Sequence, residues 1–287
     1  FTPEQQRILF LIFYVGFGIL AGIWPLHTWS PDGHASAPTA VSMLHAGVLM
    51  KLGAFGVLRV GMSLLPEGAQ YWAPLMGTIA VINIIYGAFS AMGQTDLKYV
   101  IAYSSVSHMG VVMLGLAGMN PISLTGSTMQ MFAHGIMTGL FFALVGLVYE
   151  KSHTRDILRM GGFAERMPGI AVAFVIGGLS SFGLPGTGGF VAEFLTFWGV
   201  WQSYPWMTYI GVAGVVITAT YVLRVVQKVF FGKRPDGYDD LPDARTTEWV
   251  ALVVLGAIII LTGVMPRLLT DFLNVGVHDY LRLLGKV

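Results

Sequence analysis

The stretch Gly178–Trp198, GLSSFGLPGTGGFVAEFLTFW, decides the predicted fold of this chain. An apolar helical run enters it from Pro168 and a second run leaves it, whereas Pro185 and the glycines around it interrupt the helix. A helix broken at membrane depth needs protein or a water-filled cavity to satisfy its unpaired backbone groups. Glu193 follows the break closely, and a broken helix with a buried charge is typical of ion-moving membrane proteins. The alternative is a simple kink with Glu193 reaching an interface.

The composition places this break in a membrane protein. The 287 residues are 55% hydrophobic and 11% charged, with a mean hydropathy of +0.70, whereas soluble domains carry about 25% charged residues. The net charge of +1 is too small to indicate binding to nucleic acid. The absence of cysteine excludes disulfides, iron–sulfur ligation and thiol chemistry. Because the first residue is Phe1, we expect a fragment or a processed chain.

Apolar stretches of about 20 residues, long enough to cross a bilayer, recur along the chain. We expect about eight crossings, of which the sixth is the broken one. Their predicted ranges are Ile8–Trp24, Pro38–Leu64, Trp72–Met92, Tyr99–Gly118, Ile122–Tyr149, Pro168–Trp201, Trp206–Phe231 and Glu248–Val264. The predicted fold class is therefore an all-α, polytopic membrane helix bundle with one helix broken in mid-membrane. The tail Arg267–Val287, with apolar positions out to Leu284, predicts an interfacial amphipathic helix.

Basic residues are distributed unevenly between the two sets of connections. The connections near residues 27–37, 93–98, 150–167 and 232–247 hold more Lys and Arg than the opposite set, which includes Arg7, Arg267 and Lys286. The richer side is predicted to face the cytoplasm, so that both ends of the chain face outward. Four aspartates in the last of these loops lack the spacing of a calcium-binding loop, which favours a solvated loop.

Lys51 lies in the middle of the second predicted crossing. Roughly 20 Å of helix separates it from either end at 1.5 Å per residue, which is too far for its side chain to reach an interface. A central lysine costs about 3 kcal/mol to insert, so Lys51 is a functional candidate, and a buried Lys and Glu together suit a proton relay. The alternative is a fixed Lys paired with a neighbouring carbonyl or carboxylate.

His108 and His134 lie well inside the fourth and fifth predicted crossings, and His45 precedes Lys51. A neutral imidazole can pass a proton, because one ring nitrogen donates while the other accepts. Packing without a proton role is the alternative for each, and we favour it for His45. No histidine pair has the close spacing of a zinc site. No nucleophile–base arrangement, phosphate-binding loop or dinucleotide motif is present either, so we expect neither a metal nor a cofactor in this chain.

A second interrupted segment, WPLHTWSPDGHASAP, spans Trp24–Pro38. Its three prolines, Pro25, Pro31 and Pro38, are predicted to prevent a regular helix. Two interrupted segments, one before the second crossing and one within the sixth, are the arrangement found in transporters built from inverted repeats.

These segments belong to a set of longer motifs. The set is WPLHTWSPDGHASAP (Trp24–Pro38), LHAGVLMKLGAFGVLR (Leu44–Arg59), DLKYVIAYSSVSHMG (Asp96–Gly110), MFAHGIMTGLFF (Met131–Phe142), YEKSHTRDI (Tyr149–Ile157) and SFGLPGTGGFVAEF (Ser181–Phe194). Together the motifs resemble the antiporter-like membrane subunits of proton-translocating NADH–quinone oxidoreductase, respiratory complex I, over nearly the whole chain. Subunit M of that family carries Glu in the second broken helix, where N- and L-type subunits carry Lys, so Glu193 indicates the M type.

The resemblance implies an antiporter-like inverted-repeat fold whose first part is missing. Residues 1–64 would be the remainder of the first repeat, residues 65–231 the second repeat with its broken helix at 168–201, and residues 232–287 the final crossing and interfacial tail. NAD, FMN, iron–sulfur clusters and quinone are then expected in partner subunits and none in this chain. The implied partners are N-, L- and K-like membrane subunits and the lipid bilayer, without nucleic acid, and the implied location is a bacterial inner membrane.

The resemblance also implies roles for single residues. Lys51, His108, His134 and Glu193 would form the proton relay, with His27 as a further candidate. One position departs from the family pattern: most relatives carry Lys seven residues before the His of the PLHTW motif, and here that residue is Leu20. Either water, His27 or Lys51 replaces the missing Lys, or this subunit pumps differently or not at all.

Two rival functions stay open. A multisubunit cation/proton antiporter or a membrane-bound hydrogenase would have the same fold, and the neighbouring genes would discriminate between them. A structural spacer that does not pump would agree with Leu20, but it would not explain why Lys51 and Glu193 are buried at such a cost.

Overall fold

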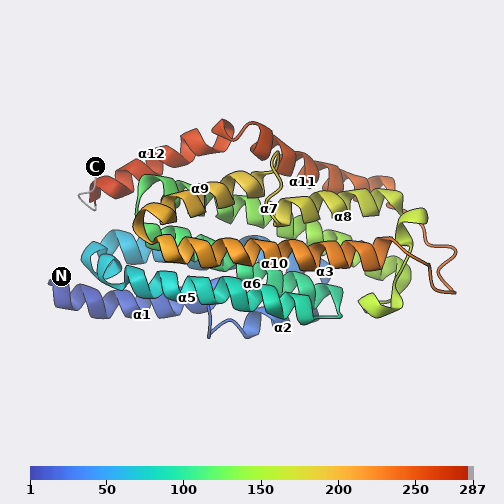
Figure 1. Cartoon of the computed structure of the whole chain (residues 1–287), viewed down its shortest axis with the longest axis horizontal. Helices are drawn as coiled ribbons and strands as arrows, with labels where there is room; N and C mark the ends of the chain where they lie inside the picture. Colours follow the sequence, from blue (N-terminus) through green and yellow to red (C-terminus); the bar gives the residue numbers. More distant parts are fainter. Residues whose placement is uncertain (284–287) are drawn as a thin grey trace.

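The computed structural model describes residues 1–283, which form a bundle of helices lying side by side along one long axis (Figure 1). Leu284 and Lys286 of the predicted tail lie outside the described residues. The helices in chain order are α1 (Pro3–Ala21), α2 (Trp29–Ser36), α3 (Thr39–Leu44), the π-helix η1 (His45–Leu49), α4 (Met50–Gly56), the π-helix η2 (Val57–Met62), α5 (Pro66–Gly93), α6 (Leu97–Gly118), α7 (Pro121–Ser152), the short 3₁₀ turns η3 (Ile157–Arg159) and η4 (Phe163–Glu165), α8 (Pro168–Ser181), α9 (Gly188–Ser203), α10 (Pro205–Phe230), α11 (Thr246–Val264) and α12 (Arg267–Leu283).

The all-helical membrane bundle predicted from the sequence is confirmed. Within residues 1–283, seven stretches are long and apolar enough to cross a membrane, Thr39–Met62 counting as one, and α8 is a shorter apolar helix. The observed helices start earlier than predicted at α1 and α5, where Pro3 and Pro66 occupy the first helical turn. Proline suits that position because its missing N–H would be unpaired there anyway. The first turns of α1 and α5 also contain polar residues, so a search for apolar stretches places the helix starts too late.

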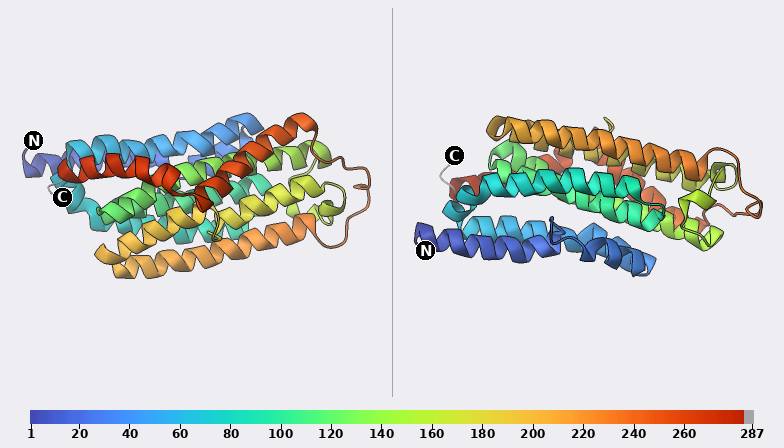
Figure 2. Two further views of the ribbon diagram at one scale, coloured as in Figure 1. Left: turned by 90° about the horizontal axis from the view of Figure 1, so that it is seen from above. Right: turned by 60° about the horizontal axis from the view of Figure 1, so that its bottom comes forward.

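The prediction that three prolines prevent a regular helix in Trp24–Pro38 is wrong, because this segment contains α2. Pro31 lies in the first turn of α2, where the backbone N–H groups lack helical partners. Only Pro25 and Pro38 therefore lie outside a helix. α1 and α2 follow one another with a non-helical interruption between them, and they lie with α3 and α4 along one flank of the bundle (Figure 2).

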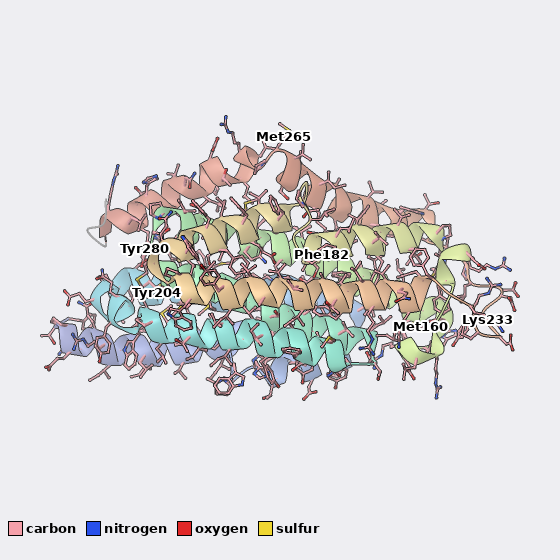
Figure 3. The ribbon with its side chains drawn as sticks, viewed as in Figure 1. Met160, Phe182, Tyr204, Lys233, Met265 and Tyr280 are labelled. Atoms are coloured by element: carbon pink, nitrogen blue, oxygen red, sulfur yellow. The ribbon has the colours of Figure 1, made fainter. Side chains whose placement is uncertain are left out.

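The break between α8 and α9 lies about midway along the bundle, where Phe182 is labelled in Figure 3. Gly183 and Gly186 adopt positive φ angles of 68° and 96°, which glycine reaches without strain. The backbone groups of the break are largely satisfied locally: Leu184 N–H donates to Leu179 O at 2.9 Å, and the Thr187 hydroxyl donates to Leu184 O at 2.8 Å. Protein therefore supplies the partners that a broken membrane helix needs.

The connections predicted to be basic gather at one end of the bundle. Lys98 Nζ donates to Ala37 O at 2.6 Å and Arg155 donates to Ala35 O at 2.9 Å, so two cations neutralise the C-terminal carbonyls of α2. The next two loops meet through Gly162 N–H, which donates to Phe231 O at 3.2 Å. Lys233 lies at this end, while Tyr204 and Tyr280 lie at the other (Figure 3).

The tail forms the helix α12 as predicted, and it packs along the flank of α7 (Figure 1). Val277, Tyr280 and Leu281 join a core cluster, and Asn274 accepts a hydrogen bond from the Thr125 hydroxyl at 2.7 Å. The position of this helix at the membrane surface stays a prediction.

Candidate functional site

Lys51 lies in α4 between the two π-helical segments and is 8% exposed. Its Nζ donates to the carbonyl of Ala46 in η1. Single π-turns inside helices are frequent at functional sites. Gly47 and Gly135 allow η1 and α7 to approach closely, since a Cβ at Gly135 would lie 2.8 Å from Gly47 O and 3.9 Å from Cε of Lys51. The lysine therefore sits against the part of α7 that carries His134.

His134, His108 and Glu193 continue from Lys51 across three helices. The rings of His134 on α7 and His108 on α6 are 5.0 Å apart between centroids. His108 Nδ1 lies 3.3 Å from Oε1 of Glu193, which lies in the second turn of α9 after the break. All three residues are at most 5% exposed. We call Lys51, His134, His108 and Glu193 the buried polar row, and the structure brings these four predicted residues together.

Two polar residues that contact the buried polar row were not predicted from the sequence. Gln130 Nε2 lies 3.5 Å from both His108 Nδ1 and Glu193 Oε1, and Ser181 Oγ lies 3.2 Å from His108 Nε2. A signal existed for Gln130, because it precedes His134 by four residues and therefore shares its face of α7. Ser181 ends α8 at the break, and its contact depends on how the broken helix packs.

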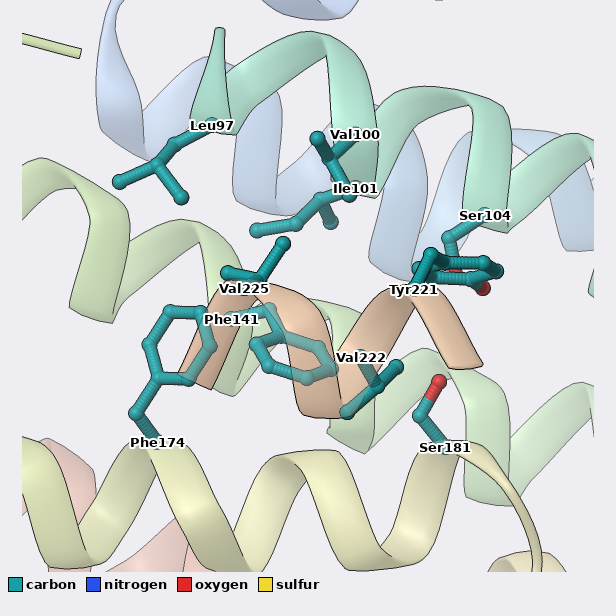
Figure 4. A pocket seen from close by; sticks show the side chains of 10 residues that line it. All are labelled: Leu97, Val100, Ile101, Ser104, Phe141, Phe174, Ser181, Tyr221, Val222 and Val225. Atoms are coloured by element: carbon teal, nitrogen blue, oxygen red, sulfur yellow. The ribbon is translucent and has the colours of Figure 1, made fainter. Parts of the chain in front are cut away.

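A small cavity of about 20 Å³ adjoins Ser181 and is lined by residues of α6, α7, α8 and α10 (Figure 4). This is room for about one water molecule. Ser104 and Tyr221 line its inner end with Ser181, and the Tyr221 hydroxyl donates to Ser104 Oγ at 2.6 Å. Apolar side chains make up the rest of the wall, for example Phe141 and Phe174. The cavity therefore has polar side chains, and a contact to the buried polar row through Ser181, at its inner end only.

A second group of histidines lies beside Lys51. His34 on α2 is fully buried, its Nε2 lies 3.5 Å from Met50 Sδ, and its ring is 5.9 Å from that of His45. The sequence predicted a packing role for His45 and gave none to His34. His27, a further candidate, does not join the row: its ring packs edge-on against Tyr86 at 4.8 Å, and neither ring nitrogen has a hydrogen-bond partner among the described residues.

This arrangement is suited to proton transfer rather than to bond-forming chemistry. An ammonium, two imidazoles and a carboxylate follow one another, and each can gain or lose a proton. Both ring nitrogens of His134 and Oε1 of Gln130 are buried without a partner among residues 1–283. In the same residues, no three His, Cys, Asp or Glu side chains gather in a way that could hold a metal ion.

The family comparison identifies the scaffold that carries this row. The model of the transmembrane family described as NADH:quinone oxidoreductase/Mrp antiporter matches residues 2–218. The chain belongs to this family. It is 38% identical to NADH-quinone oxidoreductase subunit M of Rhodobacter capsulatus over 95% of its own length. It is also 38% identical to subunit M of Pseudomonas aeruginosa over 99% of its length.

A solved structure agrees with this membership of the NADH:quinone oxidoreductase/Mrp antiporter family. The fold matches a chain of respiratory complex I from Thermus thermophilus with a TM-score of 0.93 and 33% identity, covering 98% of this chain and 60% of that one. The present chain spans 54% and 56% of the Rhodobacter and Pseudomonas subunits, so it corresponds to about half of these relatives.

Proposed function

We propose that this chain carries protons along the buried polar row, as part of an M-type membrane subunit of a proton-translocating NADH–quinone oxidoreductase. The observation that carries the proposal is the 3.3 Å contact between His108 Nδ1 and Glu193 Oε1 at the end of a row that starts at Lys51. Burying an ammonium and a carboxylate in a membrane is costly, and that cost is explained if both groups exchange protons.

Each step of the relay follows from a contact. Lys51, held at the Ala46 carbonyl, passes a proton toward His134 on the neighbouring α7. Water bridges His134 to its neighbours, because its ring nitrogens have no partner among the described residues and buried polar atoms need one. His108 accepts the proton on one nitrogen and releases it from the other toward Glu193.

The redox reaction takes place elsewhere in the complex. NAD, FMN, iron–sulfur clusters and quinone bind to partner subunits, and N-, L- and K-like membrane subunits adjoin this one. Electron transfer in those subunits changes the charge next to Lys51 and Glu193 and so drives the relay in steps. The complex is located in a bacterial inner membrane, as the bacterial origin of the relatives suggests.

The test compares wild type and Lys51→Ala in vesicles that hold the assembled complex, with the full-length subunit. We expect fewer protons taken up per quinone reduced, while assembly persists. Lys228→Ala is the matched control, because Lys228 is exposed on α10 and lies outside the row. Unchanged assembly and unchanged proton uptake in Lys51→Ala would contradict the relay and favour the structural spacer, which Leu20 already makes a candidate.

The second candidate function is a cation/proton antiporter, since the family description includes Mrp antiporters. The same vesicles discriminate between the two. Proton movement that follows a sodium gradient without quinone reduction would favour the antiporter, and strict dependence on quinone reduction favours the oxidoreductase.

A further inference from the structure

Helices α9 and α10 enclose a groove of about 510 Å³ on the surface of the bundle. This volume lies in the range of sites for drug-sized ligands, about 300–1,000 Å³. The groove begins at Phe182 and Gly183 of the break and extends along α9 to Trp198 and Trp201. The proposed relay reaches the groove only at its inner end, where Glu193 lines it.

One wall of the groove is a ladder of aromatic rings. Phe190, Phe194 and Trp198 follow one another at intervals of four residues, so they share one face of α9. The rings of Phe190 and Phe194 are 5.8 Å apart, and those of Phe194 and Trp198 are 6.5 Å apart and parallel to within 1°. Phe194 and Trp198 are 54% and 52% exposed. The ladder thus presents a row of ring surfaces to whatever fills the groove.

The inner end of the groove carries a carboxylate oxygen that has no partner among residues 1–283. Glu193 lines the groove, and its Oε1 makes the contacts with His108 and Gln130. Its Oε2 accepts no hydrogen bond from the described residues, although the side chain is only 7% exposed. Gly183, with φ of 68°, leaves room there, since a Cβ at this position would lie 2.8 Å from Oε2.

We propose that this groove is a binding site for a lipophilic amine with an aromatic or alkyl body. The ammonium group pairs with Glu193 Oε2, which supplies the opposite charge in a desolvated place. The body lies along the aromatic ladder, where ring faces also attract cations. Anionic and neutral molecules of the same shape lack the first contact. The binding site follows from the groove alone, whereas block of proton transfer by a bound amine rests on the proposed function.

Photolabelling tests the site directly in membranes that contain the assembled complex. The probe is an aryl-diazirine derivative of benzylamine, and the corresponding benzyl alcohol derivative is its neutral control. We expect the amine to label α9 and α10 saturably, with competition by unlabelled benzylamine and little competition by benzyl alcohol. Glu193→Gln should lower the apparent affinity about tenfold, equivalent to about 1.4 kcal/mol, as expected for the loss of a charge-assisted hydrogen bond.

A second pair of variants separates binding from relay function. Trp198→Leu shortens the ladder outside the polar row and should weaken labelling, while Trp249→Leu on α11 removes a tryptophan outside the groove and should not. Equal labelling of wild type and Glu193→Gln, or equal competition by the alcohol, would overturn the proposal and leave a groove for acyl chains. Absence of labelling in the assembled complex would overturn it in favour of a neighbouring subunit that covers the groove. Labelling does not measure pumping, so these outcomes are independent of the relay.

Discussion

The interruptions between α1 and α2 and between α8 and α9 differ in the side chains that lie beside them. Between α8 and α9, the break is followed by Glu193, which contacts His108. Between α1 and α2, the corresponding region has Leu20 in the last turn of α1 and a histidine, His27, whose ring nitrogens lack partners among the described residues. Both breaks interrupt the helical hydrogen bonding of the backbone. Only the break between α8 and α9 lies next to an ionisable side chain that contacts another one.

The two breaks are also held in place differently. The first relies on Asn83 of α5, whose side chain accepts from Trp24 N–H at 2.7 Å and donates to Val106 O at 2.8 Å. The second is held by close backbone packing, because a Cβ at Gly263 of α11 would overlap Gly186 and Thr187. A helix break is therefore a structural device of its own, and its use for proton transfer depends on the charged groups placed beside it.

The largest difference between the breaks should appear on removing their titratable groups. Glu193→Gln keeps the shape but removes the acid, so coupled turnover should fall at least about tenfold, since a proton-transfer group contributes factors of about 10² to 10⁴ to its step. His27→Gln at the first break should leave turnover close to wild type. Proton uptake and quinone reduction in vesicles measure both. Equal losses in the two variants would mean that the breaks act as equals.

A smaller but measurable effect is expected from filling the close approach at the second break. Gly263→Ala forces α11 away from Gly186 and should lower the free energy of unfolding by about 1–3 kcal/mol. Gly256→Ala in the same helix is the control: nothing lies within 4 Å of a Cβ there, and alanine favours the helix. Thermal unfolding of the purified subunit or complex compares them, and equal melting temperatures would show that the break is not locked by this contact.

The crossings could be predicted from the sequence because each is a long apolar run bounded by polar residues or proline. The break in the sixth crossing was predicted for the same kind of reason, since Gly183, Pro185 and Gly186 are poor in helices. α2 was missed because proline was weighed by its presence and not by its position in the first turn. The π-turns on either side of Lys51 have no clear sequence pattern: η1 packs against α7, whereas η2 packs against α1 and α5.

The members of the polar row were predicted as single residues, and their contacts were not. A single Lys or Glu in an apolar helical stretch can be recognised from the sequence alone, and Lys51 and Glu193 were predicted for this reason. Which carboxylate oxygen meets which histidine nitrogen depends on the crossing of α6, α7 and α9, and no local pattern specifies it. The role of Gln130 as a bridge between His108 and Glu193 followed only from that crossing.

The first break offers its own stability test. Asn83→Leu keeps the approximate volume but leaves Trp24 N–H without its partner, which should cost about 1–3 kcal/mol for a buried group left unpaired. Val106 O loses only its second donor, because it lies inside α6 and keeps its helical partner. Thr78→Val in the same helix is the control, because the Thr78 hydroxyl binds only its own helix, at Pro74 O. An unchanged melting temperature for Asn83→Leu would mean that other contacts hold the first break.

The smallest effect is expected from giving the first break the lysine that relatives carry. Leu20→Lys places the new ammonium at the C-terminal end of α1, where the helix dipole favours a cation, and Leu20 is only partly buried. The row from Lys51 to Glu193 does not pass through this break, so protons taken up per quinone reduced should stay at the wild-type value, with Leu20→Met as the control of equal size. A higher proton yield in Leu20→Lys would instead mean that the first break limits pumping and that Lys51 replaces the missing lysine only in part.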